Sequence, residues 1–195
     1  QEADPTKFDE KPLRLAIDII FQKPYQQRIS LRSDKYVETT ALDDYDAWAR
    51  RSEIGKEGQW QLTLLDTAQI KRLRANTWEN LAFYRGLEGR GGRVEFQGDA
   101  TIDGKDCVKI AFVHSDAISF TRYFEKSTGL LVKTVTENGA EIREEGEIVV
   151  DGVRYPKKLI NKSQAGQITI ITFDTIKVNE AVPASEFAVP PMMAN

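Results

Sequence analysis

The sequence contains one cysteine and one histidine, and this scarcity excludes several kinds of site. A disulfide within the chain needs two cysteines, and zinc sites need more cysteine or histidine ligands than Cys107 and His114 supply. No apolar run approaches the roughly 18 residues of a transmembrane helix. Basic residues number 27 and acidic residues 30, so the concentrated basic surface that nucleic acid binding requires is missing. The composition therefore predicts no metal, no cofactor and no nucleic acid partner.

The length of 195 residues is enough for one domain with a buried core. Composition does not shift along the chain and no linker interrupts it, so we interpret residues 1–195 as a single domain. Residues 1–12, which include Pro5 and Pro12, are expected to form a flexible N-terminal segment. The polar start at Gln1 is typical of a protein after signal peptide cleavage, although a trimmed chain would begin in the same way. We expect secretion by a cleaved signal peptide.

Alternation of apolar and polar residues with a period of two dominates the chain and predicts β-strands. In residues 13–21, for example, every odd position is apolar. About eleven such strands follow one another, and several of them are joined by Asp-Gly or Asn-Gly pairs that supply the positive φ of tight hairpin turns. These pairs are Asp103-Gly104, Asn138-Gly139 and Asp151-Gly152. Because hairpins make neighbouring strands antiparallel, we expect a meander.

Residues 66–84 depart from this pattern, since they contain no Gly or Pro and carry apolar residues at spacings of three and four. They predict a helix that Asp66 or Thr67 caps and that Gly86 ends. Its expected apolar face consists of Ile70, Leu73, Thr77, Leu81 and Tyr84. A helix of about 19 residues is about 28 Å long. This length suits the mouth of a curled sheet but does not cover a flat sheet of so many strands.

The expected fold class is therefore mainly β, within the α+β class. We predict a strongly curved antiparallel sheet, or half-barrel, of about eleven strands covered by a helix.

Side chains that could carry catalysis are few. Ser115 and Asp116 follow His114, but neighbours on a strand point to opposite faces and cannot converge as a triad. We expect His114 to be a solvated histidine at the end of a hairpin. The acidic run at residues 43–46 lacks the spacing of a calcium loop. We therefore predict no catalytic residue and no enzyme. The basic pairs at 50–51 and 157–158 leave a peripheral contact with acidic lipid headgroups open.

Apolar strand surface is abundant, and one helix is available to cover it. The apolar residues form either a packed core or, where the concave face is not filled, a pocket for an acyl chain under the helix. The candidate lining residues are Leu15, Ile17, Ile19, Phe21, Trp48, Trp60, Leu62, Leu73, Trp78, Leu81, Val108, Ile110 and Phe112.

Several motifs stand in a characteristic order between about Leu13 and Pro190. They are Phe21-Gln22-Lys23-Pro24-Tyr25, the strand pair of residues 37–48, the hairpins of residues 98–110 and 123–131, and the segments 151–156 and 178–187. This ordered set resembles the LolA-like outer-membrane lipoprotein-sorting proteins. The resemblance implies a curved antiparallel sheet with a helical lid, a periplasmic location and no enzymatic activity. Lys23 stands where the carriers have an arginine that helps to hold the lid closed, so it is a candidate lid latch.

We accordingly expect a periplasmic monomer that binds a lipid or a lipoprotein acyl chain on the concave apolar face. The alternative is a ligand-free structural or interaction module of a cell-envelope complex. In that case its partners are envelope proteins, and an exposed sheet edge could add a partner strand.

Overall fold

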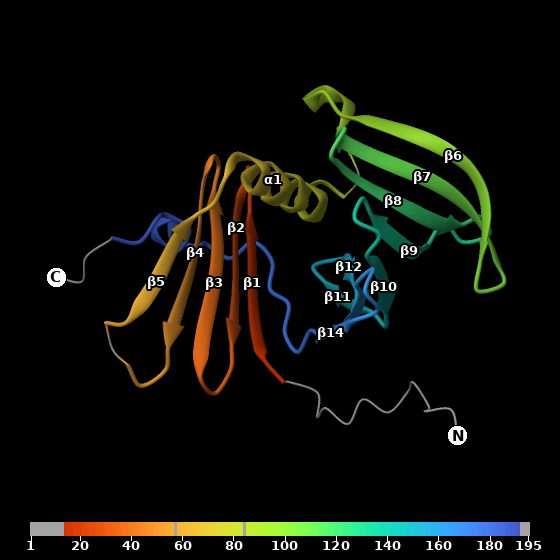
Figure 1. Cartoon of the computed structure of the whole chain (residues 1–195). Coiled ribbons are helices and arrows are strands. Elements are labelled where there is room, and N and C mark those ends of the chain that lie inside the picture. Colours follow the sequence, from red (N-terminus) through yellow and green to blue (C-terminus); the bar gives the residue numbers. More distant parts are fainter. Residues whose placement is uncertain (1–13, 57, 84, 192–195) are drawn as a thin grey trace, which may run out of the picture.

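The computed structural model describes residues 14–56, 58–83 and 85–191, which form two large antiparallel sheets, a small hairpin and one α-helix (Figure 1). The N-terminal segment of residues 1–12 and the predicted helix residue Tyr84 lie outside the described residues. The first sheet has five strands in chain order. They are β1 (Ala16–Gln22), β2 (Gln26–Arg32), β3 (Tyr36–Asp43), β4 (Asp46–Glu53) and β5 (Trp60–Leu64).

The second sheet has seven strands in the order β14-β13-β10-β9-β8-β7-β6. Its strands are β6 (Arg93–Ile102), β7 (Lys105–Ser115), β8 (Ile118–Glu125), β9 (Leu131–Thr136), β10 (Glu141–Glu145), β13 (Lys158–Lys162) and β14 (Ile168–Thr172). The predicted turns close these hairpins, with φ of 51° at Asp103 and 77° at Gly104. The prediction of a mainly β, antiparallel meander with a helix is confirmed, although the strands divide between two sheets.

Two predicted strands are each split in the structure. Residues 141–150 give β10 and β11 (Ile148–Val150), and residues 154–161 give β12 (Val153–Tyr155) and β13. The first split falls at Gly146, which has a φ of 66° that a strand residue does not adopt. The second falls at Pro156, which has no N–H for a sheet hydrogen bond. β11 and β12 therefore pair with each other as a separate hairpin.

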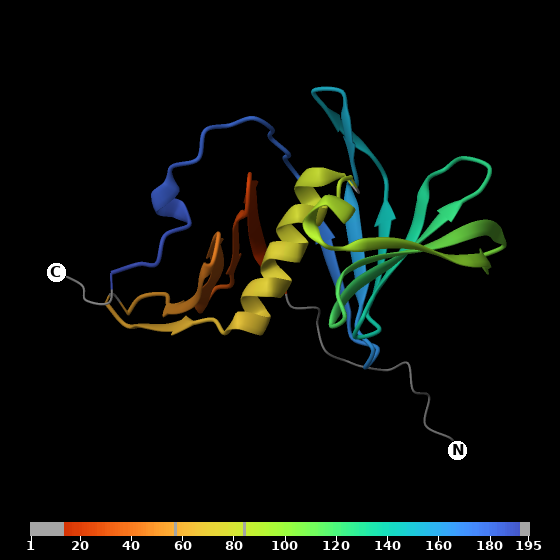
Figure 2. The ribbon, with the colours of Figure 1, turned by 90° about the horizontal axis from the view of Figure 1, so that it is seen from above.

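The helix α1 (Thr67–Ala82) connects the two sheets and lies between them (Figure 2). Asp66 caps it as predicted: its side chain accepts the backbone N–H of Gln69 at 2.8 Å, while the Gln69 side chain accepts the backbone N–H of Asp66 at 2.9 Å. The helix ends before Gly86, because Phe83 already adopts a left-handed conformation with φ of 50°. The 3-10 helix η1 (Glu88–Arg90) then leads into β6.

A C-terminal strap, residues 183–191, crosses the face of the first sheet that points away from α1 (Figure 2). It contains the 3-10 helix η2 (Ala184–Glu186). Phe187 in this strap is fully buried, and its carbonyl oxygen accepts the indole N–H of Trp48 at 2.9 Å. The first sheet therefore has an inner face toward α1 and an outer face under the strap.

Candidate ligand-binding surface

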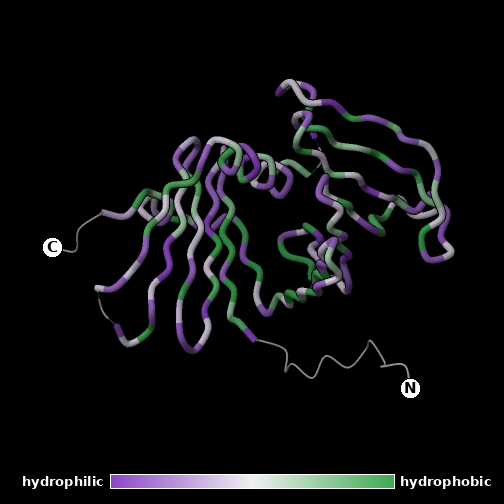
Figure 3. Tube along the Cα trace, in the orientation of Figure 1, coloured by the Kyte–Doolittle hydropathy of each residue, from purple (hydrophilic) through white to green (hydrophobic). Residues whose placement is uncertain are grey.

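The inner face of the first sheet is defined by its strand register. Phe21 pairs with Gln27, and Gln27 pairs with Leu42, so these three residues share a face because directly opposed residues point the same way. Gln27 contacts α1, which identifies this face as the inner one. The same register adds the partly buried apolar residues Ile17, Ile19, Ile29 and Leu31. The inner face of β1 and β2 is therefore almost entirely apolar, and Figure 3 shows the alternation that produces it.

The inner face of the second sheet is apolar near α1. Phe112 of β7 packs with Trp78 of the helix, and Ile110 and Phe124 pack against this pair. By register, Val94 and Phe96 of β6 continue the same face beside Phe112 and Ile110. Phe96 is 69% exposed and Val94 is 38% exposed. An apolar surface thus extends from the core under α1 to the open edge strand.

The helix α1 packs on the second sheet through residues spaced by three and four positions. Ala75 contacts Ile118 and Phe120, and Trp78 contacts Phe112. Glu79 and Ala82 complete this stripe, and Glu79 is buried. The predicted apolar face of Ile70, Leu73, Thr77 and Leu81 is only partly buried except at Thr77. The helix packs against a sheet on each of two sides, and the apolar pattern in the sequence identified only one of these two contact faces.

A cluster of ionisable side chains lies where α1 meets the second sheet. Glu79 Oε1 lies 2.5 Å from His114 Nε2, and Glu79 Oε2 lies 2.7 Å from Arg122 Nη2. The exposed fractions of these side chains are 5%, 12% and 7%. His114 also stands edge-on to the rings of Trp78 and Phe120. The prediction of a solvated His114 is wrong, because the histidine faces the helix from the inner side of its strand.

Polar contacts hold α1 to the first sheet. Gln27 is fully buried, and its Oε1 accepts a hydrogen bond from Asn76 Nδ2 at 3.0 Å. The hydroxyl of Thr77 lies 3.1 Å from the same oxygen. At the other end of this contact, Arg74 forms an ion pair with Asp44 and stacks on Tyr25 at 3.8 Å. Buried polar groups of this kind fix the position of a helix, because each must keep its partner.

Glu144 brings a carboxyl to the inner face of β10. The register places it opposite Leu159 and on the same face of β10 as Ile142. Burial raises the pKa of Glu144, and the positive charge of Arg122 opposes this rise. The residue as a whole is nevertheless exposed to solvent.

Comparison with solved structures identifies the architecture. A LolA superfamily protein from Nitrosomonas europaea superposes with a TM-score of 0.50 at 12% identity, covering 90% of this chain and 88% of that protein. The chain has a LolA-like fold. A DUF1329 family protein from Desulfovibrio piger matches with a TM-score of 0.44 at 11% identity, covering 84% of this chain and 81% of that one. A domain described as an outer membrane lipoprotein-sorting protein from Vibrio parahaemolyticus matches at 0.43 and 12%, covering 83% and 80%. No family model and no curated protein sequence matches the chain.

In this LolA-like fold, the predicted lining residues divide between two faces. Register and contacts place one group on the inner faces or on α1. This group comprises Ile17, Ile19, Phe21, Leu73, Trp78, Leu81, Val108, Ile110 and Phe112, and Leu15 continues it by alternation.

Three predicted lining residues lie on the outer face of the first sheet. Trp48 pairs with Ala41, whose neighbour Leu42 faces inward, and it contacts the strap. Leu62 pairs with Arg50, and Trp60 pairs with Ser52, in the same alternation as Trp48. These residues cannot share a surface with Ile17 and Phe21 in the described conformation.

Lys23, the candidate latch, is exposed in the turn between β1 and β2. Arg74 of α1 contacts this end of the first sheet through Tyr25 and Asp44, and Arg90 also stacks on Tyr25. The latch role of Lys23 stays a prediction.

Within the described ranges, no group of three or more His, Cys, Asp or Glu side chains is arranged to hold a metal ion. The described helical segments also include none with the length and apolarity needed to span a bilayer.

Sequence reasoning missed the Glu79–His114–Arg122 cluster, although the sequence contains a signal for it. Arg122 stands between Phe120 and Phe124 at the inward positions of one strand. A charge in an apolar row requires an opposite charge from another element. Glu79, next to Trp78 on the helix, meets that requirement.

Proposed function

We propose that this protein binds a lipid or a lipoprotein acyl chain between the inner faces of its two sheets, as a periplasmic monomer that catalyses no reaction. The observation that carries the proposal is the exposed apolar surface of Phe96 and Val94, continuous with Ile110 on the inner face. Exposed apolar area favours association at roughly 25 cal/mol per Å² removed from water. An acyl chain lying along this row would cover the phenyl ring and extend toward the β1 and β2 side chains.

The ionisable groups of the inner surface support a binding role. Glu79 contacts both His114 and Arg122 between α1 and the second sheet, and none of the three side chains is more than 12% exposed. They are engaged in positioning the helix, so they have little access to a substrate. Glu144 is a more accessible carboxyl on the inner face, and burial raises its pKa.

The periplasmic location rests on two supports. The motif order resembles periplasmic lipoprotein-sorting proteins, and the fold is similar to that of a LolA superfamily protein.

Binding of cis-parinaric acid, a fluorescent fatty acid, tests the proposal. We expect saturable binding to the unmodified protein and a loss of at least about fivefold in affinity in Phe96→Ser, because the ligand loses about 1 kcal/mol or more of apolar contact. Ile170→Ser is the matched control, since Ile170 is 56% exposed on the outer face of β14. Equal weakening in both variants, or no saturable binding, would contradict the proposal. Native mass spectrometry should also detect lipid that co-purifies with the protein.

A second candidate function is strand addition by an envelope protein. β14 is an edge strand that pairs with β13 alone among the described strands. Ile168 and Ile170 on its outer face are 60% and 56% exposed. Open strand edges with apolar side chains are sites of β-augmentation.

A photo-cross-linking residue at position 168 tests this candidate in cells, with position 95 on the opposite edge strand as control. Defined adducts at position 168 that disappear in Ile170→Lys would support strand addition. A monomer without adducts that carries bound lipid would favour acyl chain binding instead.

A further inference from the structure

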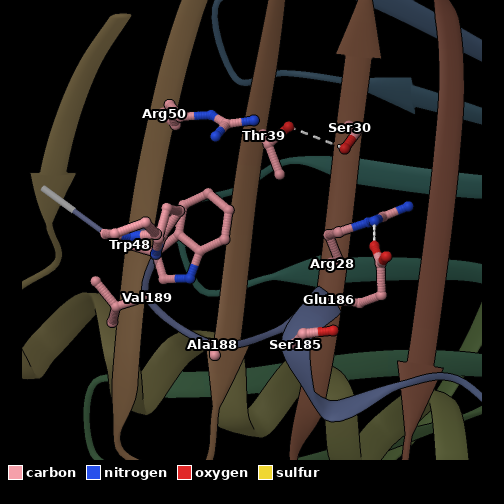
Figure 4. Close-up of a pocket in the computed structure, with 11 residues that line it drawn as sticks. Arg28, Ser30, Thr39, Trp48, Arg50, Ser185, Glu186, Ala188 and Val189 are labelled. Atoms are coloured by element: carbon pink, nitrogen blue, oxygen red, sulfur yellow. Dashed lines mark hydrogen bonds and ion pairs between the residues drawn. The ribbon is translucent and has the colours of Figure 1, made fainter. Parts of the chain in front are cut away.

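A pocket of about 360 Å³ lies on the outer face of the first sheet, beneath the C-terminal strap (Figure 4). Its sheet wall includes Arg28, Ser30, Thr39, Trp48 and Arg50, and the strap from Ser185 to Pro191 contributes the facing wall. The pocket is separated from the inner surface by the sheet itself. Its volume is at the lower end of the range for small-molecule sites.

Arg50 brings to the pocket a guanidinium that no carboxylate contacts directly among the described residues. Its side chain is only partly exposed and extends above Thr39, its partner in the register (Figure 4). Among the described residues, it has neither an ion pair nor a side-chain hydrogen bond. Arg28, in contrast, pairs with Asp18 at 2.7 Å and with Glu186 of the strap. A partly desolvated guanidinium without a carboxylate is a strong binding group for an anion.

Two hydroxyls lie beside this guanidinium. Ser30 Oγ and Thr39 Oγ1 are 3.0 Å apart and share one hydrogen bond. Each hydroxyl provides one donor and two acceptor positions, so one donor of this pair remains for a ligand. The guanidinium and the free hydroxyl donor together match the oxygens of a carboxylate or phosphate.

Ser185 and Glu186 of the strap also line the pocket, and the Glu186 carboxylate is paired with Arg28. The part of the pocket formed by Trp48 and the last residues of the strap is apolar. Trp48 is 4% exposed, and its N–H is taken by the carbonyl of Phe187, so the indole offers only ring surface. Val189, Pro190 and Pro191 of the strap face the same space. A ligand therefore meets the donors of Arg50, Ser30 and Thr39 on the sheet and apolar side chains at Trp48 and at the end of the strap.

We propose that this pocket binds a small amphipathic anion, namely a carboxylate or phosphate monoester carried on a short apolar body. The anionic group lies between Arg50 and the hydroxyls of Ser30 and Thr39, and the apolar body lies between Trp48 and the strap. Because the ligand contacts both walls, its binding holds the strap against the sheet. The site is independent of acyl chain binding on the inner faces.

Hexyl phosphate and hexanoate are the probes that test the site, with hexanol as a neutral control. We expect both anions to shift the indole N–H resonance of Trp48, and hexanol to bind at least about tenfold more weakly. Comparing the two anions distinguishes phosphate from carboxylate ligands. Inorganic phosphate alone should also bind more weakly than hexyl phosphate, because it gains nothing from the apolar walls.

Arg50→Gln should weaken binding of the preferred anion by at least about tenfold, since one charge-assisted contact is lost. Arg51→Gln is the matched control: Arg51 is the next residue, faces inward, and pairs with Glu38 at 2.9 Å. Unchanged affinity in Arg50→Gln, an equal loss in Arg51→Gln, or no shift at Trp48 would each overturn the proposal.

Discussion

Glu79 brings a carboxylate into the contact between α1 and the second sheet, where its side chain is 5% exposed. Taking a charge out of water costs several kcal/mol, and only well-placed partners offset this cost. His114 and Arg122 are those partners, and both belong to the sheet. The helix therefore cannot leave the sheet without breaking both of these contacts, which share one carboxylate. The cluster fixes where α1 lies more than it adds net stability.

Glu79→Gln should lower the free energy of unfolding by about 3 kcal/mol, because it leaves Arg122 and His114 in the interface without the opposing charge. Urea denaturation at neutral pH measures this change. Glu137→Gln is the control, because the Glu137–Arg72 pair also joins α1 to the second sheet but is more exposed. We expect that control to lose less than about 1 kcal/mol. Similar losses in the two variants would mean that the buried cluster contributes no more to the free energy of unfolding than the exposed pair does.

Glu144 should make stability depend on pH. Its raised pKa means that the folded protein holds the proton more tightly than the unfolded chain does. The free energy of unfolding should therefore fall as pH rises from the unfolded carboxyl value of about 4.3 through the higher folded value. Glu144→Gln has no carboxyl to titrate at this position and lacks this pH-dependent contribution, so its stability relative to wild type should increase between pH 4 and pH 7.

Urea titrations across this range check the prediction for Glu144. Glu145→Gln is a matched control, because Glu145 is adjacent in sequence, faces outward and pairs with Lys158 at 2.7 Å. A pH profile of Glu144→Gln parallel to that of wild type would contradict the assigned environment.

At the scale of elements, Gly92 determines how closely the loop after α1 approaches the second sheet. A Cβ at this position would lie 2.6 Å from Leu87 Cδ1 and 2.8 Å from the carbonyl oxygen of Val113. Leu87 is 2% exposed and packs with Trp78 and Phe112, so it has little room to shift. The glycine thus allows the loop to close the core at the end of the helix.

Gly92→Ala should destabilise the protein by about 1–3 kcal/mol through overpacking of this core. Gly89→Ala provides the comparison, since a Cβ at Gly89 would meet no atom within 4 Å and its φ is not positive. We expect that variant to be neutral or slightly stabilising. Thermal unfolding of the two variants distinguishes a packing effect from a general effect of glycine replacement in the loop.

Local elements could be predicted from the sequence, because their signals are local. Asp66 caps α1, and Asp103-Gly104 closes a hairpin, through contacts within a few residues. Alternation alone does not show which face of a sheet a strand's apolar residues occupy. That depends on the turns and the pairing register, because a shift of the register by one residue moves every side chain of the strand to the opposite face. Trp48 and Ile17 both stand at apolar positions, yet the register places them on opposite faces. The contacts of Glu79 could not be predicted from local sequence, because its partners belong to strands that are distant along the chain.

At the scale of the whole molecule, α1 is the joint between two sheets whose inner faces are both rich in apolar residues. The strap covers the outer face of the first sheet, while parts of the inner faces remain exposed at Phe96 and Val94. A protein that needed only a core would gain by covering these side chains. The proposed acyl chain binding requires this exposed apolar surface next to a helix held by polar contacts.

Photo-labelling with a diazirine-bearing palmitate, followed by peptide mass spectrometry, tests acyl chain binding most directly. We predict that labels concentrate on the inner faces, at residues such as Phe96, Ile110 and Ile19, and that unlabelled palmitate competes for them. Labels confined to the outer face, at Ile170 or Val189, would contradict it, as would labelling that palmitate does not reduce.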